Sequence, residues 1–244
     1  MILSSEYVGR CLERIGKSAK VRDPLVIHPY TNDDIRKLKR DLTASVDLRL
    51  GTWFVSLRKP RMAELRSGSN AAQFSETQYV PLGDSYFLHP GSFVLGITLE
   101  WLRLPKNVAG YVIGKSSWGR RGLIIATATG VHPGFMGCLT LELTNVGEIP
   151  IQIETGSKIC QIFLHKVQIE RNSTAKPEDS QFSMKRKPDV GTIKADPRAA
   201  VSRLKRLAEE LTDTGKELSD PNVEKAIDQM YRKLESALRK MHMC

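Results

Sequence analysis

The sequence predicts a mainly β fold, a distorted barrel or jelly roll, with a short helix before it and a helical hairpin after it. Short runs of β-forming residues separated by turns fill the span 42–168, which favours a barrel or sandwich over βαβ units. Apolar residues at helical spacing appear before and after that span. We therefore expect a β domain at 1–168, an extended segment at 169–195 and a basic amphipathic helical tail at 196–244.

The N-terminal region carries the first expected elements. A short helix is predicted from Ser5 to about Gly16, and a polar connector is predicted from Thr31 to Lys39. The strands that follow are bounded by turn residues, for example those at 145–147 and 154–156. The expected strands cover 45–50, 53–55, 86–88, 93–99, 110–114, 123–125, 138–143, 149–153 and 159–164.

The tail is predicted from a change in composition after Gln168. Residues 170–194 are polar and strand-poor, and two amphipathic helices follow, the first at about 197–212. The second begins at Asp220 as its cap, with Pro221 suited to the first helical position. Its apolar residues recur at steps of four and three, at Val223, Ile227, Met230, Leu234, Leu238 and Met241. The pattern is typical of a helical hairpin or short coiled coil that packs on another protein surface, and its basic residues favour a solvated face over a nucleic-acid stripe.

Composition and charge exclude several classes of protein. No run of about 18 apolar residues is present to span a bilayer, and the N-terminus resembles neither a secretory signal nor a transit peptide, so we expect a cytoplasmic protein. The four cysteines are scattered, with no CxxC motif, which predicts neither a disulfide framework nor a zinc site. A net charge of +10 suits polyanions in general. A triphosphate and a merely solvated basic surface both fit this charge, and a nucleic-acid role is not favoured.

Two segments carry residues suited to ligand chemistry. The turn-rich stretch 114–123 places paired hydroxyls between a lysine and two arginines, a combination that can cradle phosphate or simply form a solvated turn. It lacks the spacing of a Walker A loop. The small-residue stretch 126–137 can offer main-chain groups to a nucleotide base.

The expected strand at 138–143 carries a single carboxylate. Alternation places Leu139, Leu141 and Leu143 on one face and Thr140, Glu142 and Thr144 on the other. Glu142 is thus an acid on an otherwise apolar strand. From this pattern alone, a solvent-facing residue or an ion-pair partner is favoured over a catalytic group.

Taken together, these segments resemble the dCTP deaminases of the dUTPase-like superfamily over about residues 1–168. The resemblance rests on the order and spacing of five stretches, at 44–51, 87–91, 115–123, 133–137 and 139–145. It implies a dUTPase-type fold that forms a homotrimer, or a higher homo-oligomer, of distorted β-barrels with the deoxycytidine nucleotide bound between subunits. It also implies that Mg²⁺ accompanies the substrate triphosphate and that no zinc or other protein-bound metal takes part.

The resemblance also assigns roles to individual residues. It implies catalytic roles for Glu142, Ser116, Arg120 and Ala128. It implies substrate-binding roles for Lys115, Ser117, Arg121, Thr127 and Gln161, and a lid over the triphosphate that contains Phe182, Lys185 and Arg186. The chain has one residue fewer than some relatives between Gly122 and Ala128, and Lys115 replaces an arginine of the family.

The reaction implied is the hydrolytic deamination of dCTP to dUTP and ammonia. Glu142 takes a proton from the attacking water and returns it to the ring, a shuttle that a single carboxylate can perform. Zinc deaminases use H-x-E and P-C-x-x-C ligands for the same step, and neither motif is present in the sequence.

Two other functions remain as alternatives. The first is a dUTP or dCTP pyrophosphatase, which His132 disfavours because relatives that hydrolyse the phosphate carry an aspartate there to activate water. The second is a non-catalytic pyrimidine-nucleotide sensor whose helical tail recruits a partner protein, which an intact Glu142, Ser116 and Arg120 disfavour.

Overall fold

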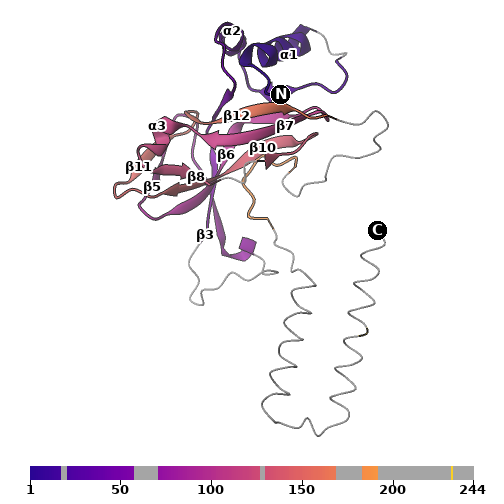
Figure 1. Cartoon of the computed structure of the whole chain (residues 1–244). Coiled ribbons are helices and arrows are strands. Elements are labelled where there is room, and N and C mark those ends of the chain that lie inside the picture. The colour runs from indigo at the N-terminus through magenta and orange to yellow at the C-terminus, as the bar shows by residue number, and fades with distance from the viewer. Residues whose placement is uncertain (18–20, 58–70, 127–129, 169–182, 192–231, 233–244) are drawn as a thin grey trace, which may run out of the picture. The chain divides into compact units, whose positions relative to one another are not determined.

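A computed structural model describes residues 1–17, 21–57, 71–126, 130–168, 183–191 and Arg232 (Figure 1). Residues 1–63 and 70–191 form one compact unit, which holds all of these residues except Arg232. The expected helices at 197–212 and from Asp220 onward lie outside the described residues, apart from Arg232. The proposed division of the chain after residue 168 therefore stays a prediction.

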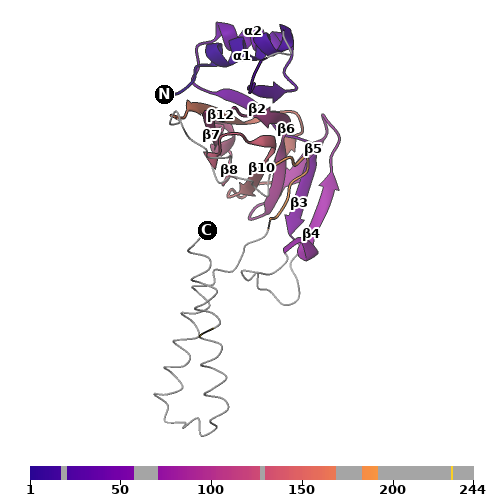
Figure 2. The ribbon, with the colours of Figure 1, turned by 90° about the vertical axis from the view of Figure 1, so that its right-hand side faces the viewer.

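Two helices stand at the N-terminal side of the unit and pack against each other (Figures 1 and 2). Helix α1 (Ser5–Lys17) confirms the predicted helix. Helix α2 (Asn32–Arg40) shows that the expected polar connector at 31–39 was wrong. The Thr31 hydroxyl accepts from the Asp34 backbone N–H at 3.1 Å, and the Asp34 carboxylate accepts from the Thr31 backbone N–H at 2.9 Å. This capping box, with acids in the first turn and bases in the last, stabilises a helix that has no buried residue.

The rest of the unit is built from antiparallel sheets, which confirms the mainly β prediction. A six-stranded sheet has the order β4 (Ser75–Tyr79), β3 (Trp53–Leu57), β6 (Phe93–Arg103), β10 (Met136–Asn145) and β8 (Leu123–Ile125), with β1 (Val26–His28) also on β6. A four-stranded sheet has the order β2 (Val46–Arg49), β12 (Lys158–Lys166), β7 (Val108–Gly114) and β9 (Gly130–Val131). A two-stranded sheet joins β11 (Ile151–Glu154) to β5 (Ser85–Leu88). The 3₁₀ helix η1 (Ala71–Phe74) and helix α3 (Ser116–Gly119) lie between strands.

The core lies between the inner faces of these sheets. Leu48 of β2, Ile162 of β12 and Leu141 of β10 are fully buried and belong to one hydrophobic cluster. The burial of Leu139, Leu141 and Leu143 confirms the predicted inner face of β10. Consequently the alternate residues of β10, Glu142 among them, face away from this core.

The turn that follows helix α3 packs against the turn that follows β10. Asn145 is buried and donates its side-chain amide to Leu88 O at 2.9 Å and to Ile149 O at 2.8 Å, while its Oδ1 accepts from Gly147 N at 2.9 Å. Gly122 has φ +90°, and a Cβ there would come within 2.9 Å of Gly147 N. Only glycine fits this close contact, so the segment after α3 is fixed against the turn after β10.

Candidate functional site

Helix α3 is attached to the four-stranded sheet on both sides of its hydroxyl-bearing residues. The Trp118 indole N–H donates to Lys158 O of β12 at 2.9 Å. The Arg121 guanidinium lies over the Trp118 ring, with its carbon 5.8 Å from the ring centroid. The backbone N–H of Lys115 donates to Ile159 O at 3.1 Å. A helix of four residues has little stability of its own, so these contacts hold its shape.

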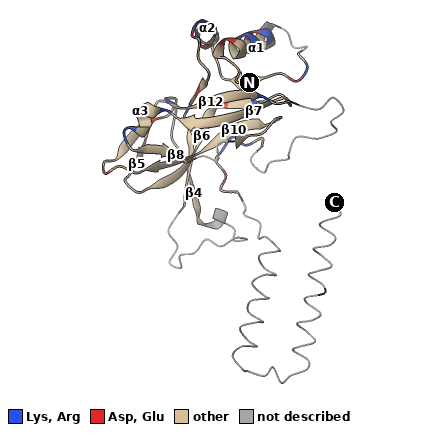
Figure 3. Ribbon diagram, viewed as in Figure 1, with Lys and Arg blue, Asp and Glu red and all other residues tan. Residues whose placement is uncertain are grey.

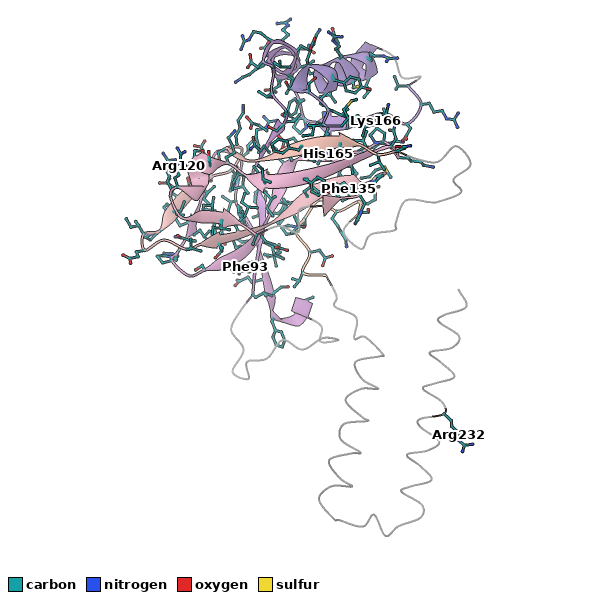
Figure 4. All side chains as sticks on the ribbon, in the orientation of Figure 1. Phe93, Arg120, Phe135, His165, Lys166 and Arg232 are labelled. Carbon is teal, nitrogen blue, oxygen red and sulfur yellow. The ribbon has the colours of Figure 1, made fainter. Side chains whose placement is uncertain are left out.

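The groups at the centre of this segment are not engaged by the rest of the unit. Ser116, Ser117 and Arg120 are exposed, and no other side chain in the described part of the chain pairs with their hydroxyl and guanidinium groups. Figure 4 shows Arg120 projecting at one end of the sheets, and Figure 3 marks basic residues beside α3 in blue. The segment thus presents hydrogen-bond donors and positive charge on a fixed support, as an anion-binding surface requires.

Lys115, in contrast, is held by a carboxylate. Its ammonium group lies 2.6 Å from Asp47 Oδ1, and the ammonium group of Lys158 lies 3.1 Å from Asp47 Oδ2. Burial opposes ionisation of Asp47, but the two ammonium groups outweigh it and hold the pKa of Asp47 below its ordinary value. Asp47 therefore stays charged and anchors Lys115, the residue just before α3.

A cavity of about 280 Å³ opens beside this ion pair, between α2 and the strands β2 and β12. Two predicted substrate-binding residues, Lys115 and Gln161, line it together. The Ser45 hydroxyl donates to Gln161 Oε1 at 3.0 Å, which fixes the orientation of that amide. The other charged residues of the lining are mixed in sign, Asp34, Lys37, Asp41, Asp47, Arg49 and Lys158. The cavity thus joins Lys115 and Gln161, while Ser116, Arg120 and Glu142 are not part of its lining.

Glu142 lies at the middle of β10, half-buried on the face that carries Thr140 and Thr144. Its direct neighbour on β6 is the buried Leu95, and its backbone carbonyl accepts from Ala126 N at 2.8 Å. The predicted placement of this carboxylate on an otherwise apolar strand is therefore correct. The residues beside Ala126 that were expected to approach the base, Thr127 and Ala128, lie outside the described residues.

Strand β8 sets the separation between α3 and Glu142 within one chain. Leu123 of β8 pairs with Asn145 and Ile125 pairs with Leu143, so α3 enters at the Asn145 end of β10. Ala126, beside Glu142, is three residues farther along, or about 10 Å at the rise of a strand. Within one chain, α3 thus precedes the Leu123 end of β8, whereas Glu142 lies beside the residue that follows the other end of β8.

The described part of the expected lid lies along the start of β10. Met184 N donates to Met136 O at 2.6 Å, and Cys138 N donates to Lys185 O at 3.0 Å. Lys185 pairs with Asp189 at 2.8 Å, and Arg186 lies 5.0 Å over the Trp101 ring. Phe182 lies outside the described residues. The two basic residues predicted for the lid are therefore engaged within this chain, Lys185 by Asp189 and Arg186 by the Trp101 ring.

Sequence reasoning missed two charged residues beside α3 and one buried ion pair. Asp47 stands on the polar face of an alternating run, a signal that the sequence does contain, whereas Lys158 has no local signal. Arg49 donates through Nε to Glu100 Oε1 at 2.6 Å, and its backbone N–H donates to Glu100 Oε2 at 2.8 Å.

Among the residues described, no cluster of His, Cys, Asp or Glu is placed to hold a metal ion, and no helix is long and apolar enough to cross a membrane.

Comparisons with known proteins agree with the sequence resemblance. The model of the dCTP deaminase-like protein family matches residues 13–167. A dUMP-forming dCTP deaminase of Dictyoglomus thermophilum is 40% identical over 169 residues, which cover 68% of this chain and 81% of the relative. A dCTP deaminase of Halorubrum lacusprofundi is 32% identical over 209 residues, which cover 81% of this chain and 93% of the relative.

A solved structure was also found, that of the 2'-deoxycytidine 5'-triphosphate deaminase of Agrobacterium tumefaciens. It is 21% identical to this chain, with a TM-score of 0.47, and the match covers 67% of this chain and 46% of that one. The family match spans most of the described unit and includes α3, β10 and β12. The chain therefore belongs to the dCTP deaminase-like family.

Proposed function

We propose that this protein deaminates dCTP hydrolytically, with Glu142 as the proton shuttle. The observation that carries the proposal is the position of Glu142, a half-buried carboxylate at the centre of a strand whose inner face is fully packed. A carboxylate in such a place has a restricted orientation and limited access to water. Both properties suit a group that must transfer protons at a defined point.

The proposed chemistry needs only water, the base and this carboxylate. Glu142 removes a proton from water as the oxygen attacks C4 of cytosine, and it passes the proton to the ring nitrogen N3. Glu142 then takes the remaining proton from the C4 hydroxyl and passes it to the amino group, which leaves as ammonia as the C4–N bond breaks and the C4 carbonyl forms. Uracil and ammonia are the products, and the carboxylate ends in its starting state.

The donors of α3 have two proposed roles. The hydroxyl of Ser116 and the guanidinium of Arg120 orient the water and the carboxylate, and Ser117 and Arg121 bind the phosphates. Their exposure within one chain supports a site completed by a second subunit, since α3 and Glu142 lie apart along β8. We therefore propose a homotrimer. The outer face of β7, where Tyr111 and Ile113 are 50% and 41% exposed, supports self-association.

The proposed nucleotide product is dUTP. His132 supports this product, because relatives that hydrolyse the phosphate carry an aspartate at this position to activate water, and an imidazole stands there in this chain. A dUMP product is the second candidate, because several similar relatives, including that of Dictyoglomus thermophilum, are dUMP-forming enzymes. Mg²⁺ is proposed to accompany the triphosphate, with no metal in the deamination step itself.

Incubation with defined nucleotides tests the proposal. The full-length protein is given dCTP, dCMP or dUTP with Mg²⁺, and ammonia and nucleotides are measured over time by chromatography. We expect equal amounts of ammonia and dUTP from dCTP, and no reaction with dUTP. Ammonia with dUMP and pyrophosphate would retain the deaminase and reject the proposed product, whereas no ammonia from any cytosine nucleotide would reject the deaminase.

A further inference from the structure

A second cavity, of about 420 Å³, lies beneath α1 and is lined by none of the residues discussed above for the reaction. Its volume falls in the range of about 300–1,000 Å³ that is usual for small-molecule sites. One wall is formed by Tyr7, Cys11, Arg14 and Ile15, which share one side of α1 because they are spaced by four, three and one residues. The adjacent side of α1 carries Val8 and Leu12, which are buried in the core.

The remaining walls are fixed by hydrogen bonds between segments that are distant in the sequence. Val167 N donates to Asn107 O at 2.8 Å, and Lys166 N donates to Met1 O at 3.0 Å. Asp23 adopts φ 53°, and its Oδ2 accepts from Lys106 N at 2.8 Å. The cavity is therefore part of the fold, not a gap between independent loops.

The charges that line this cavity are strongly biased toward one sign. Arg14, Arg22, Lys106 and Lys166 are exposed cations, and Asp23 is the single acid in the lining. Asp23 is already engaged, by Lys106 N and by Arg103 at 3.9 Å, and within the described residues none of the four lining cations has an ion-pair partner. Like charges gathered without counter-charges repel each other, and a bound anion relieves that repulsion.

The floor of the cavity is apolar. Leu3, Leu25 and Val108 are buried there, and Tyr7, a residue that is 54% exposed, also lines the cavity. A simple inorganic anion would use the cations but leave this floor and the Tyr7 ring without a contact. A ligand with a flat ring and a phosphate group matches both parts of the lining, because arginine forks bind phosphate and an exposed tyrosine can stack on a base.

We propose that the cavity beneath α1 is a binding site for a nucleoside phosphate, separate from the deamination site. Figure 4 shows Lys166 at the opposite end of the sheets from Arg120, so the two sites are reached from different sides of the unit. A ligand there contacts α1, the segment 21–25 and the β6–β7 turn together, and it can change their packing without entering the reaction.

Cys11 provides a reporter within the cavity. Burial raises the pKa of the Cys11 thiol, so its alkylation by iodoacetamide is slow and sensitive to access. The rate is followed on the full-length protein by mass spectrometry of the peptide that contains Cys11, with ATP, inorganic tripolyphosphate or adenosine as the probe. We expect saturable protection by ATP and weaker protection by either fragment. Unchanged alkylation with ATP, or equal protection by ATP and tripolyphosphate, would overturn the proposal of a nucleoside phosphate site.

Variants of two lining cations distinguish binding in this cavity from an indirect effect on Cys11. Arg14→Gln and, separately, Lys106→Gln are expected to raise the ATP concentration for half-protection about tenfold, because each removes a charge-assisted hydrogen bond. Arg10→Gln is the matched control on the same helix, since Arg10 pairs with Glu6 and does not line the cavity. Deamination of dCTP by all three variants verifies their folding. Protection that is unchanged in both Arg14→Gln and Lys106→Gln would reject the site.

Discussion

Two ion pairs involve residues of β2 that are two positions apart, Asp47 and Arg49, and they have different roles. Glu100 is fully buried and accepts from both the backbone and the guanidinium of Arg49, whereas Asp47 is 28% exposed and pairs with Lys115, just before α3, and with Lys158, at the start of β12. The first pair joins β2 to β6 within the core. The second joins β2 to the segment that carries the proposed substrate-binding residues. The single stretch 44–51 therefore contributes to one ion pair that stabilises the fold and to another that positions α3.

The environments also shift the two acids in opposite directions. Burial raises the pKa of Glu100 although Arg49 opposes the shift, while for Asp47 the two ammonium groups prevail over burial and lower the pKa. Burial thus disfavours the charged form of Glu100, and its hydrogen bonds to Arg49 offset only part of this cost. The charged form of Asp47 is stabilised by its two ammonium partners.

Removal of the buried acid is expected to have the largest effect on stability. Glu100→Ala leaves Arg49 without its main partner and a polar backbone N–H without an acceptor. We expect a loss of about 3 kcal/mol in the free energy of unfolding, at the low end for a buried ion pair because Arg49 also donates to Pro29 O. Urea denaturation measures the loss, and a change below about 1 kcal/mol would show that the pair is not needed for the fold.

Removal of the partly exposed acid is expected to affect activity more than stability. Asp47→Asn keeps the shape but frees Lys115 and Lys158, so the residue just before α3, Lys115, loses its anchor. We expect a fall of at least about tenfold in kcat/KM for dCTP, with a loss of only about 1 kcal/mol in stability. Asp84→Asn, an exposed acid elsewhere, is the control. Equal activity of the two variants would remove the positioning role from Asp47.

Acid titration is expected to separate the two carboxylates by sign. The folded pKa of Asp47 is lowered, so its contribution to stability is present at neutral pH and is lost as the pH falls through that pKa. The folded pKa of Glu100 is raised, so its contribution is larger at low pH and is lost as the pH rises through that pKa. Melting temperatures of wild type, Asp47→Asn and Glu100→Gln between about pH 7 and about pH 3 should diverge in opposite directions. Parallel profiles would contradict the assigned environments.

The smallest effect is expected for Lys158, the second lysine that pairs with Asp47. Lys158→Gln leaves Lys115 paired with Asp47 and removes an ammonium group whose side chain is 46% exposed. We expect a change of less than about 0.5 kcal/mol in stability and about twofold or less in kcat/KM. A larger loss than in Lys115→Gln would place the anchor of α3 on Lys158 instead.

The strands were largely predictable because their inner faces follow a period of two. β10 is the clearest case, where Leu141 and Leu143 are fully buried and Glu142 faces away from the core. The unexpected strands β1, β4 and β9 are short or polar, and tertiary pairing decides them. Helix α2 has no buried residue, and its capping box at Thr31 was the signal that could have identified it.

The candidate site was predictable in its residue types and not in its pairings. Lys115 and Asp47 are 68 residues apart in the sequence, and no local pattern indicates that one would hold the other. Gln161 and Lys115 share a cavity because β12 pairs with both β2 and β7, a register that composition does not fix. Long-range strand register is therefore the step at which residue-level reasoning needed the fold.

Substitution of Glu142 tests the central claim most directly. Ammonia release from dCTP is measured for wild type, for Glu142→Gln and for Glu148→Gln, an exposed glutamate just beyond β10. Nucleotide affinity is measured on the same samples. The proposed shuttle predicts that Glu142→Gln loses about 10²–10⁴-fold in rate while its affinity stays within about threefold and Glu148→Gln behaves as wild type. A Glu142→Gln variant that keeps more than about a tenth of the wild-type rate would contradict the assignment of Glu142 as the proton shuttle.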